Sequence, residues 1–352
     1  MSTFLYVLLG LFMFGVIIFI HELGHFVCAK AFHVAIEEFA IGMGPKILSR
    51  VGKDGVRYSL RLIPMGGFVS MVGEDEDSDN PGALCRKPVW QRMIIVAAGA
   101  IMNLLLGFVL MGFAVGFSPK LYSTTISGFN IVDETGAPVE TEEFLGLRVG
   151  DTLEKIGSRS IHVRSDFVYE VMFLKNTPVD VTVRRDGKST VLHDVSFPTR
   201  AESGVTFGNA AFIQTAELSK NAPEVLRQSF FGSLSTIRVL WTSLLNTVKG
   251  EYGTDAISGP VGVIGEVKET VSVGWDAFLF LVVMLTMNIG MVNLMPLPAL
   301  DGGRLFFMLI ELIRRKPINP KYEGYVHAAG LVLLMGLMIF ITYNDIVRIF
   351  FK

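Results

Sequence analysis

Charged side chains are scarce in this chain of 352 residues. Asp, Glu, Lys and Arg together make up 18% of the sequence, hydrophobic residues make up 51%, and the mean hydropathy is +0.49. Soluble domains usually carry about 25% charged residues, so this composition favours a protein with several membrane-spanning helices. The net charge is −2, which does not indicate binding to nucleic acid.

Cysteine is nearly absent as well. The two cysteines, Cys28 and Cys85, lie far apart and form no CxxC pair, which argues against a disulfide framework and against a zinc site built from cysteines. The N-terminus also lacks the basic segment and the small-residue cleavage site of a secretory signal. We therefore expect the first apolar segment to be retained as a membrane span.

Four segments are long enough to cross the hydrocarbon core of a bilayer, which takes about 20 apolar residues in a helix. They are residues 3–26, 93–117, 277–300 and 328–351. Lys and Arg are concentrated in the connections between the first and second segments and between the third and fourth. The positive-inside rule then places both connections in the cytoplasm, and places both termini and residues 118–276 outside it.

Two stretches outside these segments have the alternation of β-strands. In residues 55–72, apolar and polar residues alternate, and Pro64 to Gly67 then separate this run from a second short apolar run, which predicts a cytoplasmic β-hairpin. Residues 124–200 contain several short β-type runs, one with a hairpin turn at Asp186–Gly187, and they indicate a compact β-rich module outside the membrane.

Residues 221–249 place apolar side chains on one face of a helix. This helix could lie on the outer membrane surface or pack on the β-rich module, and the sequence leaves both arrangements open. The expected organisation is therefore a membrane part over residues 1–117, a β-rich domain over 118–205, an amphipathic linker over 206–276 and a second membrane part over 277–352.

The end of the first apolar segment carries the sequence His21-Glu22-Leu23-Gly24-His25. On a helix His21 and His25 lie one turn apart on the same face, so both imidazoles can bind one Zn²⁺. Glu22 then follows the first ligand and can act as general base on a metal-bound water. This pattern predicts a hydrolytic zinc site.

A catalytic zinc needs a third protein ligand. His33 follows the expected end of the helix, and His327 borders the fourth apolar segment. Asp301 is the best candidate, because it ends a long uncharged run after two prolines that break the helix, and broken helices at membrane depth line cavities or binding sites. His21, His25 and Asp301 all lie at span ends that face the cytoplasmic side.

Together these motifs resemble one family. HELGH, "FAIGMGPKIL" (39–48), "IPMGGFVSM" (63–71), "SGPVGV" (258–263) and "NLMPLPALDGG" (293–303) are similar to those of the site-2 proteases, which are intramembrane zinc metalloproteases, and most similar to the bacterial branch typified by RseP. The resemblance implies a mainly α-helical membrane fold of four transmembrane helices, with a re-entrant β-hairpin and an inserted extracytoplasmic PDZ-like domain. It also implies zinc held by His21, His25 and Asp301, with Glu22 as the base.

The resemblance further implies a bacterial inner-membrane enzyme that cuts single-span proteins within the membrane after a site-1 protease has trimmed them. Anti-sigma factors and signal-peptide remnants are examples of such substrates. "AGAIMN" (98–103) is similar to a family motif in which Ala100 replaces a proline, and it keeps Asn103. We expect Asn103, Asn293 and the hairpin residues Gly67 and Phe68 to bind the unwound substrate.

Two other functions fit part of the pattern. A membrane-anchored zinc protease of a different fold would explain HELGH, but it gives no role to Asp301 or to the broken third segment. A transporter or PDZ scaffold could bind an ion through His21, Glu22, His25 and Asp301 without hydrolysis. Glu22 counts against that alternative, because a purely structural zinc site needs no general base.

Overall fold

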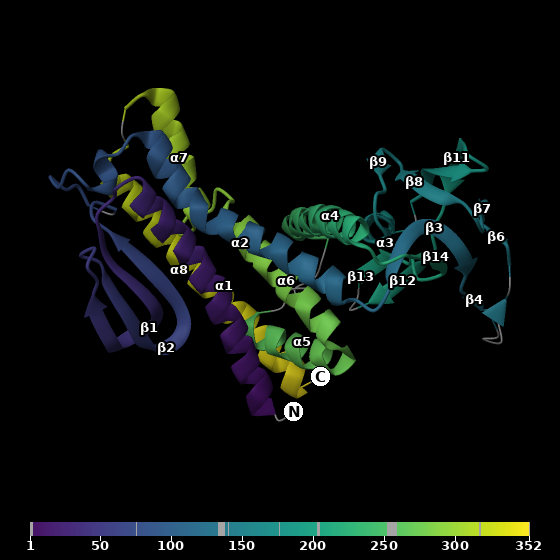
Figure 1. Ribbon diagram of the computed structural model, residues 1–352, viewed down its shortest axis with the longest axis horizontal. Helices are drawn as coiled ribbons and strands as arrows, with labels where there is room; N and C mark the ends of the chain where they lie inside the picture. The colour runs from purple at the N-terminus through teal and green to yellow at the C-terminus, as the bar shows by residue number, and fades with distance from the viewer. Residues whose placement is uncertain are drawn as a thin grey trace. The chain divides into compact units, whose positions relative to one another are not determined.

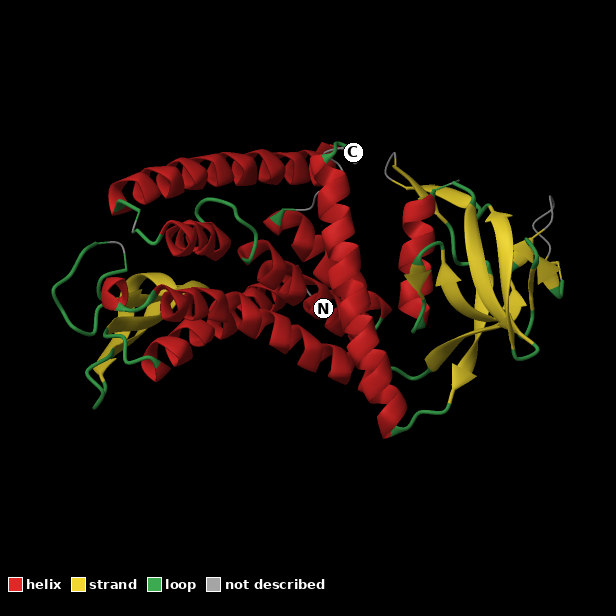
Figure 2. Cartoon of the chain, turned by 90° about the horizontal axis from the view of Figure 1, so that it is seen from above, coloured by secondary structure: helices red, strands yellow, loops and turns green. Residues whose placement is uncertain are grey.

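The computed structural model describes residues 3–74, 76–132, 138–139, 141–175, 177–202, 205–251, 259–316 and 318–351. The chain divides into two compact units. One unit, Met1–Leu110 with Ile257–Lys352, is mainly helical, and the other, Met111–Ala256, is mainly β-sheet (Figures 1 and 2).

In the described part of the chain, four helices are long and apolar enough to span a membrane, which is the number of spans expected from the sequence. They are α1 (Thr3–Ala31), α2 (Val89–Phe117), α6 (Trp275–Asn293) and α8 (Pro320–Phe351). The third span ends at Asn293, whereas the sequence predicted residue 300. Residues 294–300 leave the helix because Pro296 and Pro298 lack the N–H that a helix requires, and α7 (Asp301–Arg314) then begins at Asp301.

Helices of the first unit approach one another closely at small residues. A Cβ on Gly24 of α1 would overlap the carbonyl oxygen of Ala98 in α2, so only glycine allows this approach. Further along α1, Met13 and Ile17 form a buried core with Val267 of α5 (Pro260–Val273). Helix α5 therefore belongs to the helical unit, although it lies within residues 206–276, which the sequence analysis assigned to a linker.

The hairpin expected in residues 55–72 is built differently from the prediction. Its two strands are β1 (Ile36–Val51) and β2 (Arg57–Met71), so residues 55–72 do not form a hairpin by themselves. Ile41 pairs with Gly67 on one side and with Leu60 on the other, so both halves of β2 flank the start of β1. Gly66, between these two halves, has a φ of +87°, a left-handed conformation that glycine adopts without strain. A short 3₁₀ helix, η1 (Leu84–Arg86), follows.

The second unit is a β-rich module with one short helix, α3 (Arg164–Leu174). Its main sheet has the strand order β11-β10-β8-β3-β14, with β9 paired to β8. These strands are β3 (Leu121–Phe129), β8 (Thr152–Ile156), β9 (Arg159–Ser160), β10 (Val179–Arg185), β11 (Lys188–Val195) and β14 (Ile213–Leu218). Three smaller strand pairs are β4 (Ile131–Val132) with β5 (Pro138–Val139), β6 (Glu143–Phe144) with β7 (Leu147–Arg148), and β12 (Thr199–Glu202) with β13 (Val205–Gly208).

Strand β14 pairs with β3, so the module extends past residue 205, which the sequence analysis gave as its end. Helix α4 (Ala222–Val248) also belongs to this unit. It packs on the module beside α3, where Arg238 pairs with Asp166 and Glu170, and the ring of Phe231 stacks on His162. Its apolar side, which includes Leu226, Phe230 and Trp241, is exposed. Of the two arrangements left open, the structure shows the packing on the module.

Asp151 anchors the turn before β8. Its carboxylate is 1% exposed and accepts hydrogen bonds from Nε and Nη2 of Arg185 at 2.8 and 2.7 Å and from the backbone N–H of Arg148 at 2.9 Å. Burial alone would raise the pKa of Asp151, but these donors outweigh it and hold the pKa below its usual value.

We predict that Asp151→Asn lowers the free energy of unfolding of the module by about 2–3 kcal/mol at pH 7, because Arg185 loses its charged acceptor. The folded pKa lies below the unfolded value of about 3.9, so the contribution is complete above that value and is lost as pH falls toward the folded pKa. Hydrogen exchange of the full chain measures the difference. The same change at Asp186, exposed in the β10–β11 turn, is the control. Equal effects of the two variants at pH 7 would contradict the prediction.

Candidate active site

His21 and His25 lie on the buried face of α1, and each residue is 8% exposed. Their Nε2 atoms are 3.2 Å apart. Nδ1 of His25 lies 2.9 Å from the carbonyl oxygen of Ile95, and since a carbonyl only accepts, Nδ1 donates. Nε2 of the neutral ring then carries a free lone pair, which is the state that a metal ligand requires.

Asp301 brings the third donor atom. As the first residue of α7, it places Oδ2 at 3.0 Å from Nε2 of His21 and 3.4 Å from Nε2 of His25. Its Oδ2 is buried and accepts no hydrogen bond. One ligand atom from each of the three residues lies within 4.8 Å of the others. Two imidazoles and one carboxylate are a donor set of catalytic zinc sites, so these residues fit the metal predicted from the sequence.

Within the described part of the chain, no other group of His, Cys, Asp and Glu converges in this way. The alternative third ligands lie outside the group. His33 follows the end of α1 with a φ of +55°, and His327 on α8 bonds to the backbone of Ala299.

Gly99 of α2 provides the room for the two imidazoles. A Cβ at this position would overlap Nε2 of His25 and lie 2.8 Å from Nε2 of His21. The sequence analysis quoted this residue only within a motif and gave it no role. A glycine in a helix that is otherwise apolar is a signal of close approach, but it does not say what approaches.

Glu22 faces the hairpin. Its Cγ lies 3.3 Å from where a Cβ on Gly67 would stand. Gly67 belongs to the half of β2 that pairs with the start of β1. Glu22 directly follows His21 on α1, and its Cγ lies beside this strand of the hairpin.

The four expected substrate-binding residues lie in different surroundings. Asn103 is fully buried, with its amide nitrogen 3.5 Å from Nδ1 of His21. Asn293 is the last residue of α6, at the break before Asp301. Phe68 is half-buried on β2 beside Gly67, and its ring lies 4.8 Å from the guanidinium of Arg61. Their role in substrate binding stays a prediction.

The loop before Asp301 is strained. Ala299 has a φ of +68°, a left-handed conformation that costs a residue with a side chain about 1–2 kcal/mol. Its backbone N–H donates to Nδ1 of His327 at 3.0 Å. The sequence contained no sign of this bond, because Ala299 and His327 come from separate elements.

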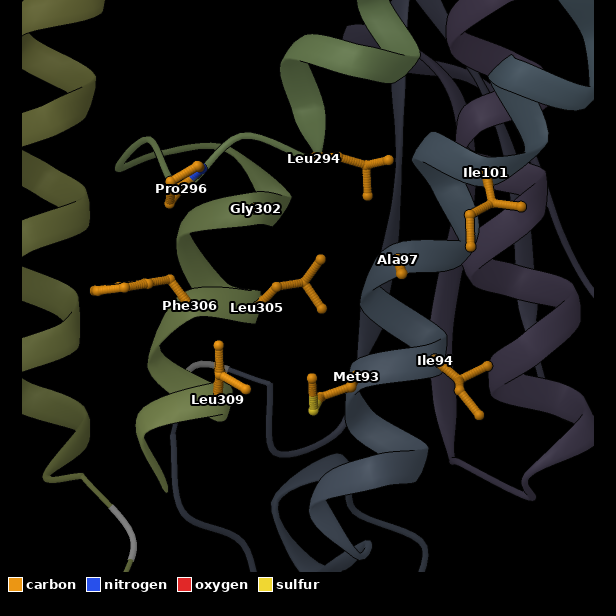
Figure 3. Close-up of a pocket in the computed structure, with 10 residues that line it drawn as sticks. All are labelled: Met93, Ile94, Ala97, Ile101, Leu294, Pro296, Gly302, Leu305, Phe306 and Leu309. Carbon is orange, nitrogen blue, oxygen red and sulfur yellow. The ribbon is translucent and has the colours of Figure 1, made fainter. Parts of the chain in front are cut away.

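Helix α7 does not pack tightly against α2 along its whole length. A groove of about 540 Å³ separates them, and side chains from both helices point into it (Figure 3). All of its lining residues are apolar or glycine: Met93, Ile94, Ala97, Ile101, Leu294, Pro296, Gly302, Leu305, Phe306 and Leu309. It offers no group for hydrolysis. Helix α7 is also tied by two ion pairs, Arg92–Glu311 at 2.6 Å and Arg304–Glu74 at 2.5 Å.

We predict that Gly99→Ala abolishes stoichiometric zinc binding, because the added methyl group occupies space that the imidazoles need. The helix itself should tolerate the change, since alanine is a better helix former than glycine. Zinc content of the purified protein, measured by atomic absorption, tests this. Gly116→Ala in the same helix is the matched control, because a Cβ there meets nothing within 4 Å. Full zinc content in Gly99→Ala would show that the site does not need this gap.

Comparison with known proteins agrees with this geometry. The model of peptidase family M50 matches residues 9–337. A protein of Clostridium acetobutylicum named as a predicted zinc metalloprotease is 33% identical, over 98% of each chain. The regulator of sigma-W protease RasP of Bacillus subtilis is 30% identical over 96% of this chain and 97% of its own. The zinc metalloprotease RasP of Bacillus licheniformis has the same identity and coverage.

These matches favour a protease over an ion-binding scaffold or transporter. They cover nearly the whole chain, including both helical segments that supply the three donor atoms. The chain therefore belongs to peptidase family M50, the site-2 proteases, and is a zinc metalloprotease of a multi-pass membrane fold.

Proposed function

We propose that this protein cleaves the transmembrane segment of single-span membrane proteins, with zinc held by His21, His25 and Asp301. The observation that carries the proposal is the convergence of these three donors inside a unit of apolar helices, with Glu22 directly after His21 and beside a β-strand. A hydrolytic site in such a unit is useful if the bond that it cuts also lies in the membrane.

The chemistry divides between the metal and one carboxylate. When bound, zinc lowers the pKa of its water to about 7. The carboxylate of Glu22 takes the proton of the attacking water and passes it to the departing peptide nitrogen. The histidines and Asp301 keep their donor atoms in place, and the carbonyl of Ile95 fixes the ring of His25.

Asn103 is suited to a related task. Its side chain is buried beside Nδ1 of His21. With the amide oxygen turned to that nitrogen, Asn103 accepts a hydrogen bond from Nδ1–H, which leaves Nε2 free for the metal. This role would orient a ligand, and the contact of Asn103 with substrate expected from the sequence stays a prediction. Asn293, Gly67 and Phe68 are likewise proposed contacts with substrate.

The hairpin supplies a place for the unwound substrate. A transmembrane helix keeps its peptide groups in internal hydrogen bonds, so it must open before it is cut. Among the described strand pairs, residues 67–71 pair only with β1, which leaves their other side for strand addition. Gly67 puts that edge next to Glu22.

The orientation follows from the basic loops. If these loops lie in the cytoplasm, the β-rich module lies outside it. The module is proposed to be PDZ-like. Its proposed role is to exclude substrates whose outer domain a site-1 protease has not yet removed. The name of the Bacillus subtilis relative refers to regulation of sigma-W. For this chain, that supports a substrate that controls a sigma factor, such as an anti-sigma factor in the bacterial inner membrane.

We predict that Glu22→Gln lowers cleavage of a membrane-embedded reporter at least 10²-fold and keeps about one zinc per chain, because the variant loses a proton acceptor and no ligand. His21→Ala should lose both zinc and cleavage. Two reporters are used, one with a short outer segment and one with a folded outer domain. Unchanged cleavage in Glu22→Gln would disprove the role of Glu22, and equal cleavage of both reporters would disprove the size filter.

A second prediction concerns the strand edge. Gly67→Ala places a methyl group 2.9 Å from the carbonyl oxygen of Ala40 and 3.3 Å from Glu22, so substrate should bind more weakly and KM should rise several-fold. Zinc content should not change. Gly128→Ala on strand β3 serves as control, since its backbone has no positive φ and a Cβ there makes only an ordinary contact, at 3.5 Å with Gln214. If Gly67→Ala cleaves with an unchanged KM, the substrate does not use this edge.

A further inference from the structure

Helix α8 touches the rest of its unit sparingly. No residue in its apolar window is buried, whereas 28–39% of the corresponding residues in the other three spans are buried. Within α8, Glu323, His327 and Gly330 are less exposed than their neighbours and recur every three or four residues. They therefore lie on one face of the helix, which is the face turned to the protein.

This face meets the loop that leads to Asp301. A Cβ on Gly330 would overlap Pro298, so the helix backbone lies directly against the loop. A Cβ on Gly303, in the first turn of α7, would stand 3.2 Å from Cε1 of His327. Between these two contacts, Nδ1 of His327 accepts a hydrogen bond from the backbone N–H of Ala299, with the two nitrogens 3.0 Å apart.

We propose that His327 is a positioning residue of the active site. It holds Ala299 in its left-handed conformation, and Ala299 lies two residues before Asp301. The direction in which the chain enters α7, and with it the place of the Asp301 carboxylate, then depends on this hydrogen bond. The inference rests on the proposed function, in which Asp301 is a zinc ligand.

The contact requires one particular state of the imidazole. Because Nδ1 accepts, the proton of the neutral ring is on Nε2, which lies 3.9 Å from a carboxylate oxygen of Glu323. His327 does not share the space of the three donor atoms, so it acts through the backbone and not as a ligand. Without the acceptor, Ala299 loses the contact that keeps its backbone strained, and the loop can relax.

Three variants of full-length protein in detergent test the proposal. Asparagine places its side-chain oxygen near the position of Nδ1, glutamine places it near Nε2, and alanine has no acceptor. We expect His327→Asn to bind zinc about as well as the parent protein, and His327→Gln and His327→Ala to bind it about tenfold more weakly. Zinc alone is the titrant, and a competing chelator reports its dissociation constant.

Hydrogen exchange gives a readout that does not involve the metal. The segment to follow is residues 295–300. Pro296 and Pro298 have no amide hydrogen, so the exchange signal of this segment comes from its other residues. In zinc-free protein, this segment should exchange faster in His327→Gln and His327→Ala than in the parent or in His327→Asn. Tyr325→Ala, on the exposed side of the same helix, should change neither measurement.

Equal zinc affinity and equal exchange in the asparagine and glutamine variants would overturn the inference, whether or not the alanine variant folds. Asp301→Ala separates this failure from that of the proposed function. If Asp301→Ala keeps the parent's zinc affinity, Asp301 is not a ligand and the proposed function fails. If it loses zinc while the His327 variants are unaffected, only the positioning role of His327 fails.

Discussion

Three buried donor atoms lie within 4.8 Å of one another, although two separate parts of the chain supply them. This constraint requires helices α1, α2 and α7 to be held in fixed positions around the site. Two of the atoms come from neighbouring turns of α1, where helix geometry alone aligns them. The third comes from the start of α7. Gly24 lets α2 approach α1, and Gly99 leaves room for both imidazole rings. Small residues are thus placed where the site requires close backbones.

Polar side chains in the spanning helices are expensive, and here their contacts fix positions. The ring of His25 is set by the carbonyl of Ile95. At the far end of α8, Asp345 is 1% exposed and accepts the backbone N–H groups of Gly259 and Gly262 at 3.0 and 2.8 Å, which satisfies the start of α5. Helix α8 is therefore held near both ends by polar contacts, although its apolar middle is little buried.

The sequence predicted the four spans, the turn at Asp186–Gly187 and the three residues that converge, because each depends on a local pattern or on an established motif. Prediction from the sequence failed where an element is defined by its contacts with segments that are distant in the sequence. The hairpin was predicted from residues 55–72 alone, whereas β2 pairs with β1, whose alternation is weak. Strand β14 was assigned to a linker for the same reason, since only its pairing with β3 makes it part of the sheet. The contact of His327 with Ala299 joins two elements and has no sequence signature.

The position of Asp301 also explains why α7 has several polar anchors. Along the apolar groove, α7 and α2 are separated, so hydrophobic packing there does not fix the helix. The ion pairs Arg92–Glu311 and Arg304–Glu74 are both largely shielded from solvent, and they act where α7 leaves the groove and one turn after Asp301. Directional contacts of this kind define a position more narrowly than apolar contacts, which can slide. A metal ligand at the start of a loosely packed helix needs such contacts to fix its position, because a displacement of about 1 Å is enough to weaken a catalytic site.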